Sequence, residues 1–306
     1  MKHDLRVTLV LVGLFLAVQL IGLGTVNSYI KVEKDINGTI TIEHPDTVIG
    51  PQPEIERKEF SFIPVVIAIL VGTALVFLLI RFRLQRVWKY WFLFAVWITM
   101  SVFFGVYIAK YIAITIGLVL ALMKIFKPNV FIHNITEIFV YSGITILLLP
   151  LLNIVSGFLI LFFISIYDMY AVWKSKHMIK LAKFQTKNKI FAGLFIPYKK
   201  EKRAKKEIKP KLVKSKGKIA ILGGGDLAFP LIFSAAVMEN LILVKGIVKS
   251  IAFLETLIIT LFVSIALLLL FFKGKKDRFY PAMPFLSIGC AIGYLVILLI
   301  NFFIFI

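Results

Sequence analysis

The sequence is poor in cysteine, histidine and charged residues. It contains one cysteine, Cys290, and four scattered histidines in 306 residues. A single cysteine excludes an intramolecular disulfide framework and a cysteine-rich metal site. Scattered histidines without an HExxH motif argue against a zinc protease, and we expect neither a metal nor another cofactor. Only 17% of the residues are charged and 60% are hydrophobic, whereas soluble proteins average about 25% and 45–50%. The composition therefore excludes an ordinary soluble domain.

Long hydrophobic runs take the place of these residues. About 20 apolar residues in a helix cross a hydrocarbon core of about 30 Å. On this basis the sequence predicts an all-α polytopic membrane protein, a bundle of about nine transmembrane helices. The predicted spans lie near residues 5–29, 60–80, 89–108, 110–126, 132–152, 154–173, 219–239, 248–272 and 281–306.

Basic residues are concentrated between the sixth and seventh predicted spans. Residues 174–218 contain 17 Lys and Arg against two Glu, which gives 17 − 2 = +15 of the net charge of +20. Because basic loops remain in the cytoplasm, this loop and the N-terminus are expected there, and the C-terminus outside. The loop divides a six-helix part, 1–173, from a three-helix part, 219–306. We expect a multi-pass protein of the cell membrane whose basic loop can bind anionic lipids. Nucleic acid is not an expected partner, because the loop lacks a basic module interleaved with aromatic residues.

Two aspartates lie inside predicted spans, Asp168 and Asp226. An aspartate near the centre of a spanning helix costs at least about 2.5–3.5 kcal/mol, so such residues usually have a function. Asp168 precedes Lys174 by six residues and Asp226 follows Lys218 by eight, which places them roughly 9 Å and 12 Å from the same membrane edge if both segments are helical. Neighbouring helices would bring the two carboxyl groups to a common level.

Three glycines, Gly223–Gly225, precede Asp226 directly. They allow another backbone to approach closely and loosen the start of a helix. A small-residue packing face, with the aspartate satisfied by a neighbouring helix, is the alternative. The glycines lack the GxGxxG spacing of a dinucleotide-binding turn. Other polar residues, Glu137, Asn134 and Asn153 around the fifth span and Glu255 in the eighth, are expected to stabilise helix contacts, and a contact between Glu137 and the active site stays open.

Three motifs occur in a characteristic order: Tyr167-Asp168, Gly223-x-Gly225-Asp226 and Pro281-Ala282-Met283. Together with the span count, they resemble the presenilin and signal peptide peptidase family of intramembrane aspartyl proteases, and most closely its archaeal presenilin-like members. The resemblance implies that Asp168 and Asp226 are the catalytic pair. It further implies that Pro281, Ala282 and Met283 pack beside them, with Met283 replacing the usual Leu of that tripeptide.

The expected activity is that of an intramembrane aspartyl endopeptidase. Two nearby carboxyl groups share one proton, so that one can activate water and the other can polarise a peptide carbonyl. Transmembrane segments of other proteins would be the substrates, and no obligatory partner subunit is evident. The alternatives are an ion leak channel or proton-coupled transporter that uses the intramembrane carboxylates, and a non-catalytic scaffold.

Overall fold

The computed structural model describes residues 5–35, 39–52, 58–82, 84–174, 191–198, 218–274 and 280–304. The α-helices of these ranges are α1 (Leu5–Tyr29), α2 (Phe62–Arg81), α3 (Gln85–Gly105), α4 (Lys110–Phe126), α5 (Val130–Leu148), α6 (Ile154–Met169), α8 (Gly224–Leu243), α9 (Lys249–Lys273) and α10 (Met283–Ile304). Eight helical segments in this part of the chain are long and apolar enough to cross a membrane. The ninth helix, α4, has 17 residues. The predicted all-α membrane fold is confirmed.

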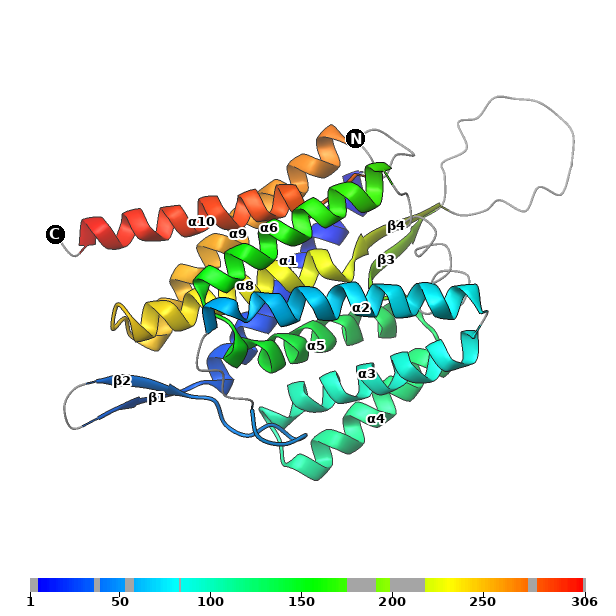
Figure 1. Ribbon diagram of the computed structural model, residues 1–306, viewed down its shortest axis with the longest axis horizontal. Coiled ribbons are helices and arrows are strands. Elements are labelled where there is room, and N and C mark those ends of the chain that lie inside the picture. The colour runs from blue at the N-terminus through cyan, green and yellow to red at the C-terminus, as the bar shows by residue number, and fades with distance from the viewer. Residues whose placement is uncertain are drawn as a thin grey trace, which may run out of the picture.

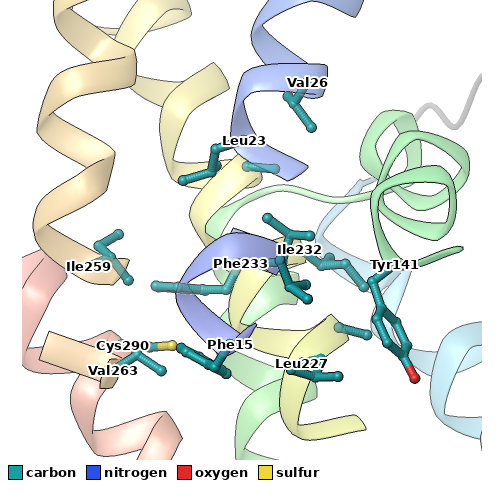
Figure 2. Close-up of a cluster of buried hydrophobic side chains, with 14 of the residues drawn as sticks. Phe15, Leu23, Val26, Tyr141, Leu227, Ile232, Phe233, Ile259, Val263 and Cys290 are labelled. Atoms are coloured by element: carbon teal, nitrogen blue, oxygen red, sulfur yellow. The ribbon is translucent and has the colours of Figure 1, made fainter. Parts of the chain in front are cut away.

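Helix α8 lies at the centre of the bundle, in contact with α1, α5, α6, α9 and α10 (Figure 1). In its most apolar stretch 83% of the residues are buried inside the protein, whereas in α2 only 6% are. Figure 2 shows the hydrophobic cluster around it, in which Phe15 of α1 and Ile259 of α9 lie beside Phe233 of α8. The most protected helix is therefore the one that carries Asp226.

Glycines bring α9 and α10 close together. A Cβ atom at Gly289 would lie 2.9 Å from the Val263 Cα, and one at Gly293 would lie 2.7 Å from the Ile259 Cα. Small residues at this spacing let two helix backbones approach within a membrane, where dispersion contacts replace the hydrophobic effect between helices. The last helix is thus held firmly against its predecessor.

Local sequence determines where α6 begins. Asn153 accepts a hydrogen bond from the Ser156 backbone N–H, and the Ser156 hydroxyl accepts one from the Asn153 N–H, which forms a capping box. These bonds satisfy two backbone donors at the start of a helix. Asn153, expected to stabilise helix contacts, instead caps its own helix.

Two antiparallel hairpins lie at opposite ends of the bundle (Figure 1). One pairs β1 (Lys31–Lys34) with β2 (Ile40–Glu43). The other pairs β3 (Gly193–Tyr198) with β4 (Lys218–Gly223), with Gly193 opposite Gly223. The predicted span 219–239 is therefore wrong at its start, because α8 begins at Gly224. The β-branched Ile219 and Ile221 favour a strand, and β3, a distant part of the sequence, supplies the pairing partner.

Candidate active site

Asp168 lies in the last turn of α6 and is buried. After Met169 the chain continues as a π-helical turn, Tyr170–Lys174, instead of ending. Such π-helical turns are rare and occur frequently at functional sites. The change of helical pitch begins two residues after the aspartate.

Asp226 lies in the first turn of α8 and is also buried. Gly223 is the N-cap residue and offers no side chain to the free N–H groups of that turn. A carboxylate there interacts favourably with the positive end of the helix dipole. Since β4 runs directly into α8, the depth of about 12 Å expected from an all-helical path does not apply.

The Pro281-Ala282-Met283 tripeptide joins the first aspartate to α10. The Met283 backbone N–H donates a hydrogen bond of 3.1 Å to Asp168 Oδ2. The Ala282 carbonyl accepts from the N–H groups of Phe285 and Leu286, so α10 begins at this point. Asp168 therefore binds a free backbone donor at the N-terminus of α10, and all three residues of the tripeptide are buried.

An aromatic cluster fixes α6, α8 and α10 relative to one another. The ring centroid of Phe158 lies 4.7 Å from that of Phe233 and 5.6 Å from that of Tyr294. Counted from these rings at about 1.5 Å per residue, Asp168 lies roughly 15 Å and Asp226 roughly 10 Å along the bundle, toward the same end. The two aspartates therefore lie at levels that differ by about one helical turn of 5.4 Å.

Two serines lie one turn from Asp168, on the side toward the aromatic cluster. The Ser165 hydroxyl on α6 is 2.8 Å from the Ser287 hydroxyl on α10. A hydrogen bond between spanning helices stabilises their contact by about 0.6–2 kcal/mol. This bond and the one from Met283 hold α6 and α10 together on one side of the site.

Residues 12–303 match the family described as signal-peptide peptidase, presenilin aspartyl protease. The chain belongs to this family. It is an intramembrane aspartyl protease and hence a hydrolase of peptide bonds.

Solved structures of the family share the fold. A presenilin family intramembrane aspartate protease in space group C222 superposes with a TM-score of 0.57 at 15% identity, covering 94% of this chain and 97% of that one. One in space group P2 gives a TM-score of 0.61 at 17% identity, covering 95% and 97%. No curated protein matches the sequence.

Tyr167, Gly225 and Gly223 are the remaining residues of the three motifs. The half-buried Tyr167 directs its hydroxyl toward α2, where Thr73 Oγ1 lies 3.5 Å away. Gly225 is exposed, and a Cβ there would approach the Phe229 ring at 3.3 Å. Gly223, the N-cap of α8, is half-buried.

The middle glycine of the motif, Gly224, is the most tightly constrained of the three. A Cβ atom at this position would overlap the hydroxyl of Tyr141, a buried residue of α5. In Figure 2 the Tyr141 ring lies against the hydrophobic cluster and its hydroxyl points away from it. The sequence motif does not specify this residue, and only the position of α5 explains why it is glycine in this chain.

A buried polar cluster lies beside the hairpin of β3 and β4, and the sequence predicted only part of it. The Lys124 ammonium on α4 lies 2.5 Å from Glu137 Oε1 on α5 and also donates to Thr136 Oγ1 at 3.0 Å. Glu137 Oε2 accepts from the Gly193 backbone N–H at 3.0 Å. Glu137 thus forms the expected structural pair and, in addition, contacts the hairpin that leads into the site. The one available signal was a lysine 13 residues before a glutamate across a short turn.

Glu255, the other intramembrane glutamate considered, lies far from this cluster. Its Oε2 accepts a hydrogen bond of 2.8 Å from Asn301, which joins α9 to α10 as expected. No group of three His, Cys, Asp or Glu side chains that could hold a metal occurs in the described part of the chain.

Proposed function

We propose that Asp168 and Asp226 are the catalytic pair and that the protein cleaves transmembrane segments of other proteins. The observation that carries the proposal is the placement of two buried aspartates at similar levels on contacting helices α6 and α8. An aspartyl protease needs two such carboxyl groups, and the described spans contain no other buried aspartate.

The reaction follows from one proton shared by two carboxyl groups. The ionised aspartate takes a proton from water while the water oxygen bonds to the scissile carbonyl carbon. The protonated aspartate transfers its proton to the carbonyl oxygen, which gives a neutral tetrahedral diol. A diol hydroxyl then gives its proton to the aspartate that is now ionised, the other aspartate passes the proton taken from water to the nitrogen, and the carbon–nitrogen bond breaks, which yields a carboxyl group and an amine.

The Met283 N–H supports this chemistry without entering it. Its bond to Asp168 Oδ2 holds the carboxyl group of Asp168 in a defined orientation. Because the donor is a backbone group at the start of a helix, its position does not depend on a side-chain rotamer. The tripeptide therefore orients one member of the pair.

A substrate helix must unwind before its peptide bonds can be attacked, and strand β4 is a suitable receiver. In the antiparallel pair, the backbone N–H and C=O groups of alternate β4 residues bond to β3. The backbone groups of the other residues, Ile219, Ile221 and Gly223, point away from β3. An unwound segment that pairs with these outward groups gains main-chain hydrogen bonds within the membrane. Asp226 follows this edge after three residues, so the added strand would lead to the carboxyl groups.

The test is cleavage of a labelled transmembrane peptide by the purified protein in detergent and in liposomes. We expect Asp168→Ala and Asp226→Ala each to abolish cleavage while the protein remains folded, and an aspartyl-protease transition-state inhibitor to block the wild type. Asp46→Asn, at an exposed site in the segment between α1 and α2, is the matched control and should cleave normally. Activity in either Ala variant would refute the pair. A gradient-dependent ion flux without cleavage would favour the channel or transporter.

The orientation belongs to the same proposal: the N-terminus and residues 174–218 are cytoplasmic, and the C-terminus is extracytoplasmic. The native Cys290 is completely buried, so single introduced cysteines report their own side of the membrane. In intact cells an impermeant thiol reagent should label Lys34→Cys and not Tyr198→Cys. The reverse pattern would invert the topology.

The basic loop is proposed to bind anionic lipids, although residues 175–190 and 199–217 lie outside the described part of the structure. Each basic residue near an anionic surface contributes about 1 kcal/mol. Cleavage in liposomes should therefore depend on anionic lipid content, and equal rates in neutral and anionic vesicles would contradict this.

A further inference from the structure

The outer edge of β3 is bound by side chains of α5. The Phe195 N–H donates to Asn134 Oδ1 at 3.1 Å, and Asn134 Nδ2 donates to the Phe195 carbonyl at 3.0 Å. One amide side chain thus replaces a neighbouring strand and satisfies both backbone groups of one residue. The same edge continues to Pro197, which has no N–H to offer to another strand.

Two further side chains occupy the beginning of this edge. The Gly193 N–H donates to Glu137 Oε2 at 3.0 Å, and its carbonyl lies 2.8 Å from His133 Nε2. His133, Asn134 and Glu137 lie on one face of α5, since residues three and four apart are neighbours on a helix. This face, with Asn134 and Glu137 as its principal contacts, is called the α5 clamp below.

Lys124 holds the clamp from the other side. Its ammonium, nearly inaccessible to solvent, contacts Glu137 Oε1 at 2.5 Å and the His133 carbonyl at 3.4 Å. A buried carboxylate is costly unless it is paired and hydrogen-bonded, and here one oxygen pairs with the ammonium while the other is left for the Gly193 N–H. The carboxylate is thereby fixed between a helix and a strand.

The clamp decides which edge of the hairpin is open. Both backbone groups of Gly193 and of Phe195 are used by α5, so β3 cannot accept another strand. In the described part of the hairpin this leaves the edge of β4, whose last residue, Gly223, is the N-cap of α8. The position of β4 along the bundle follows from its pairing with β3, which is itself fixed to α5.

We propose that Asn134 and Glu137 are positioning residues that set the cleavage register, because they fix the hairpin on which an unwound substrate strand aligns. The proposal rests on the proposed function. Along a strand each residue advances about 3.3 Å, so a small shift of the hairpin presents a different peptide bond to Asp168 and Asp226. A two-residue shift conserves the faces of the added strand and is therefore the expected error.

The experiment compares Asn134→Leu with Asn134→Asp and with Ser142→Ala. Leu has nearly the shape of Asn and makes neither hydrogen bond, whereas Asp can still accept from Phe195. The matched control is Ser142→Ala, because this buried hydroxyl on the same helix donates to the Ile138 carbonyl of its own helix. Products of one transmembrane peptide are identified by mass spectrometry, and amide exchange of residues 191–198 is followed in parallel.

For Asn134→Leu we expect products displaced by two residues at the expense of the main product, with total turnover changed less than product ratios. Exchange of the Phe195 amide should accelerate by about tenfold or more, since its acceptor is lost. Asn134→Asp should fall between Asn134→Leu and the wild type, and Ser142→Ala should match the wild type. A lower rate with unchanged product ratios overturns the register assignment.

The two measurements distinguish the possible failures. If Asn134→Leu still cleaves the peptide and the exchange of its Phe195 amide is unchanged, the clamp and the register assignment are wrong, and the proposed function stands. A wild-type protein that cleaves none of the peptides overturns the proposed function, and the register assignment falls with it.

Discussion

The two ends of the bundle differ in the partners of their acidic residues. At the end that carries β1 and β2, Glu239 contacts His44 and Glu255 accepts from Asn301, so each glutamate is bound by a side chain. At the end that carries β3 and β4, Glu137 pairs with Lys124 but also accepts from the Gly193 backbone N–H, and Asp168 accepts from that of Met283. Side-chain partners hold the two glutamates of the first end, whereas at the second end backbone N–H donors orient the carboxyl groups of Glu137 and Asp168. The end with β1 and β2 is called the hairpin-1 end below, and the end with β3 and β4 is called the site end.

The hairpins at these two ends also differ, in how deeply their residues are buried. Residues of β1 are all exposed, and its cross-strand ion pair, Lys31 to Glu43 at 3.8 Å, is also exposed. In the other hairpin, Leu194 and Ala220 are completely buried. An isolated two-stranded hairpin is marginally stable in water, so the site hairpin depends on its contacts with α5 and the core.

The largest expected contrast is between acidic residues at the two ends. In the cleavage assay, Asp168→Asn and Asp226→Asn should reduce the rate by at least about a hundredfold to ten-thousandfold, the range of general acid–base catalysis. Glu239→Gln and Glu255→Gln preserve shape and should cleave at rates close to wild type when folded. Comparable losses at both ends would show that burial, and not catalysis, explains the aspartates.

The ion pairs of the two ends should contribute very differently to stability. Removing Lys124 leaves Glu137 as an unpaired buried charge, so Lys124→Ala should lower the free energy of unfolding by about 3–5 kcal/mol. Lys31→Ala at the exposed pair should change it by about 0–1 kcal/mol. Unfolding in detergent, followed by circular dichroism, measures both, and equal effects would contradict the distinction.

The backbone donor at the site end can be removed with little damage to its helix. Met283→Pro deletes the N–H that binds Asp168, at a first-turn position where proline is tolerated. Loss of a hydrogen bond to an ionised group costs about 1.5–3 kcal/mol, which predicts a fall in kcat of about ten- to a hundredfold. Met283→Leu keeps the N–H and the side-chain volume and should remain within a few-fold of wild type; a large loss in this control would assign the role to the side chain.

The smallest effect concerns two glycines. Gly224→Ala would meet the Tyr141 hydroxyl and should destabilise the protein by about 1–3 kcal/mol, as overpacking does. Gly24→Ala in α1, at the hairpin-1 end, meets no atom within 4 Å and should stabilise its helix by about 0.5–1 kcal/mol. Thermal unfolding measures both, and Tyr141→Phe combined with Gly224→Ala should recover part of the loss.

Several sequence predictions agree with the structure because they depend on local patterns. Hydrophobic runs of about 20 residues predict spanning helices, since a bilayer allows few other structures. The predicted span 5–29 and α1 have the same limits. The glutamates expected at helix contacts, Glu137 and Glu255, do join neighbouring helices, because a charge in a spanning segment needs a partner.

The start of α8 could not be predicted in the same way. Residues 219–223 are apolar and continuous with the helix that follows, so periodicity alone assigns them to it. Only pairing with 193–198, across a long loop, makes them a strand. The Asn134 and Glu137 contacts with β3 escaped prediction for the same reason, because their partners are backbone groups of a distant segment.

The sequence by itself determined the membrane fold, the family and the two candidate aspartates, since hydrophobicity, charge and motif order are properties of single segments. Tertiary structure alone decided that Met283 holds Asp168 by its backbone, that Tyr141 fills the space beside Gly224, and that α5 closes one edge of the site hairpin. Each of these depends on distances between segments far apart in the chain, and such distances are set by packing and not by local preference.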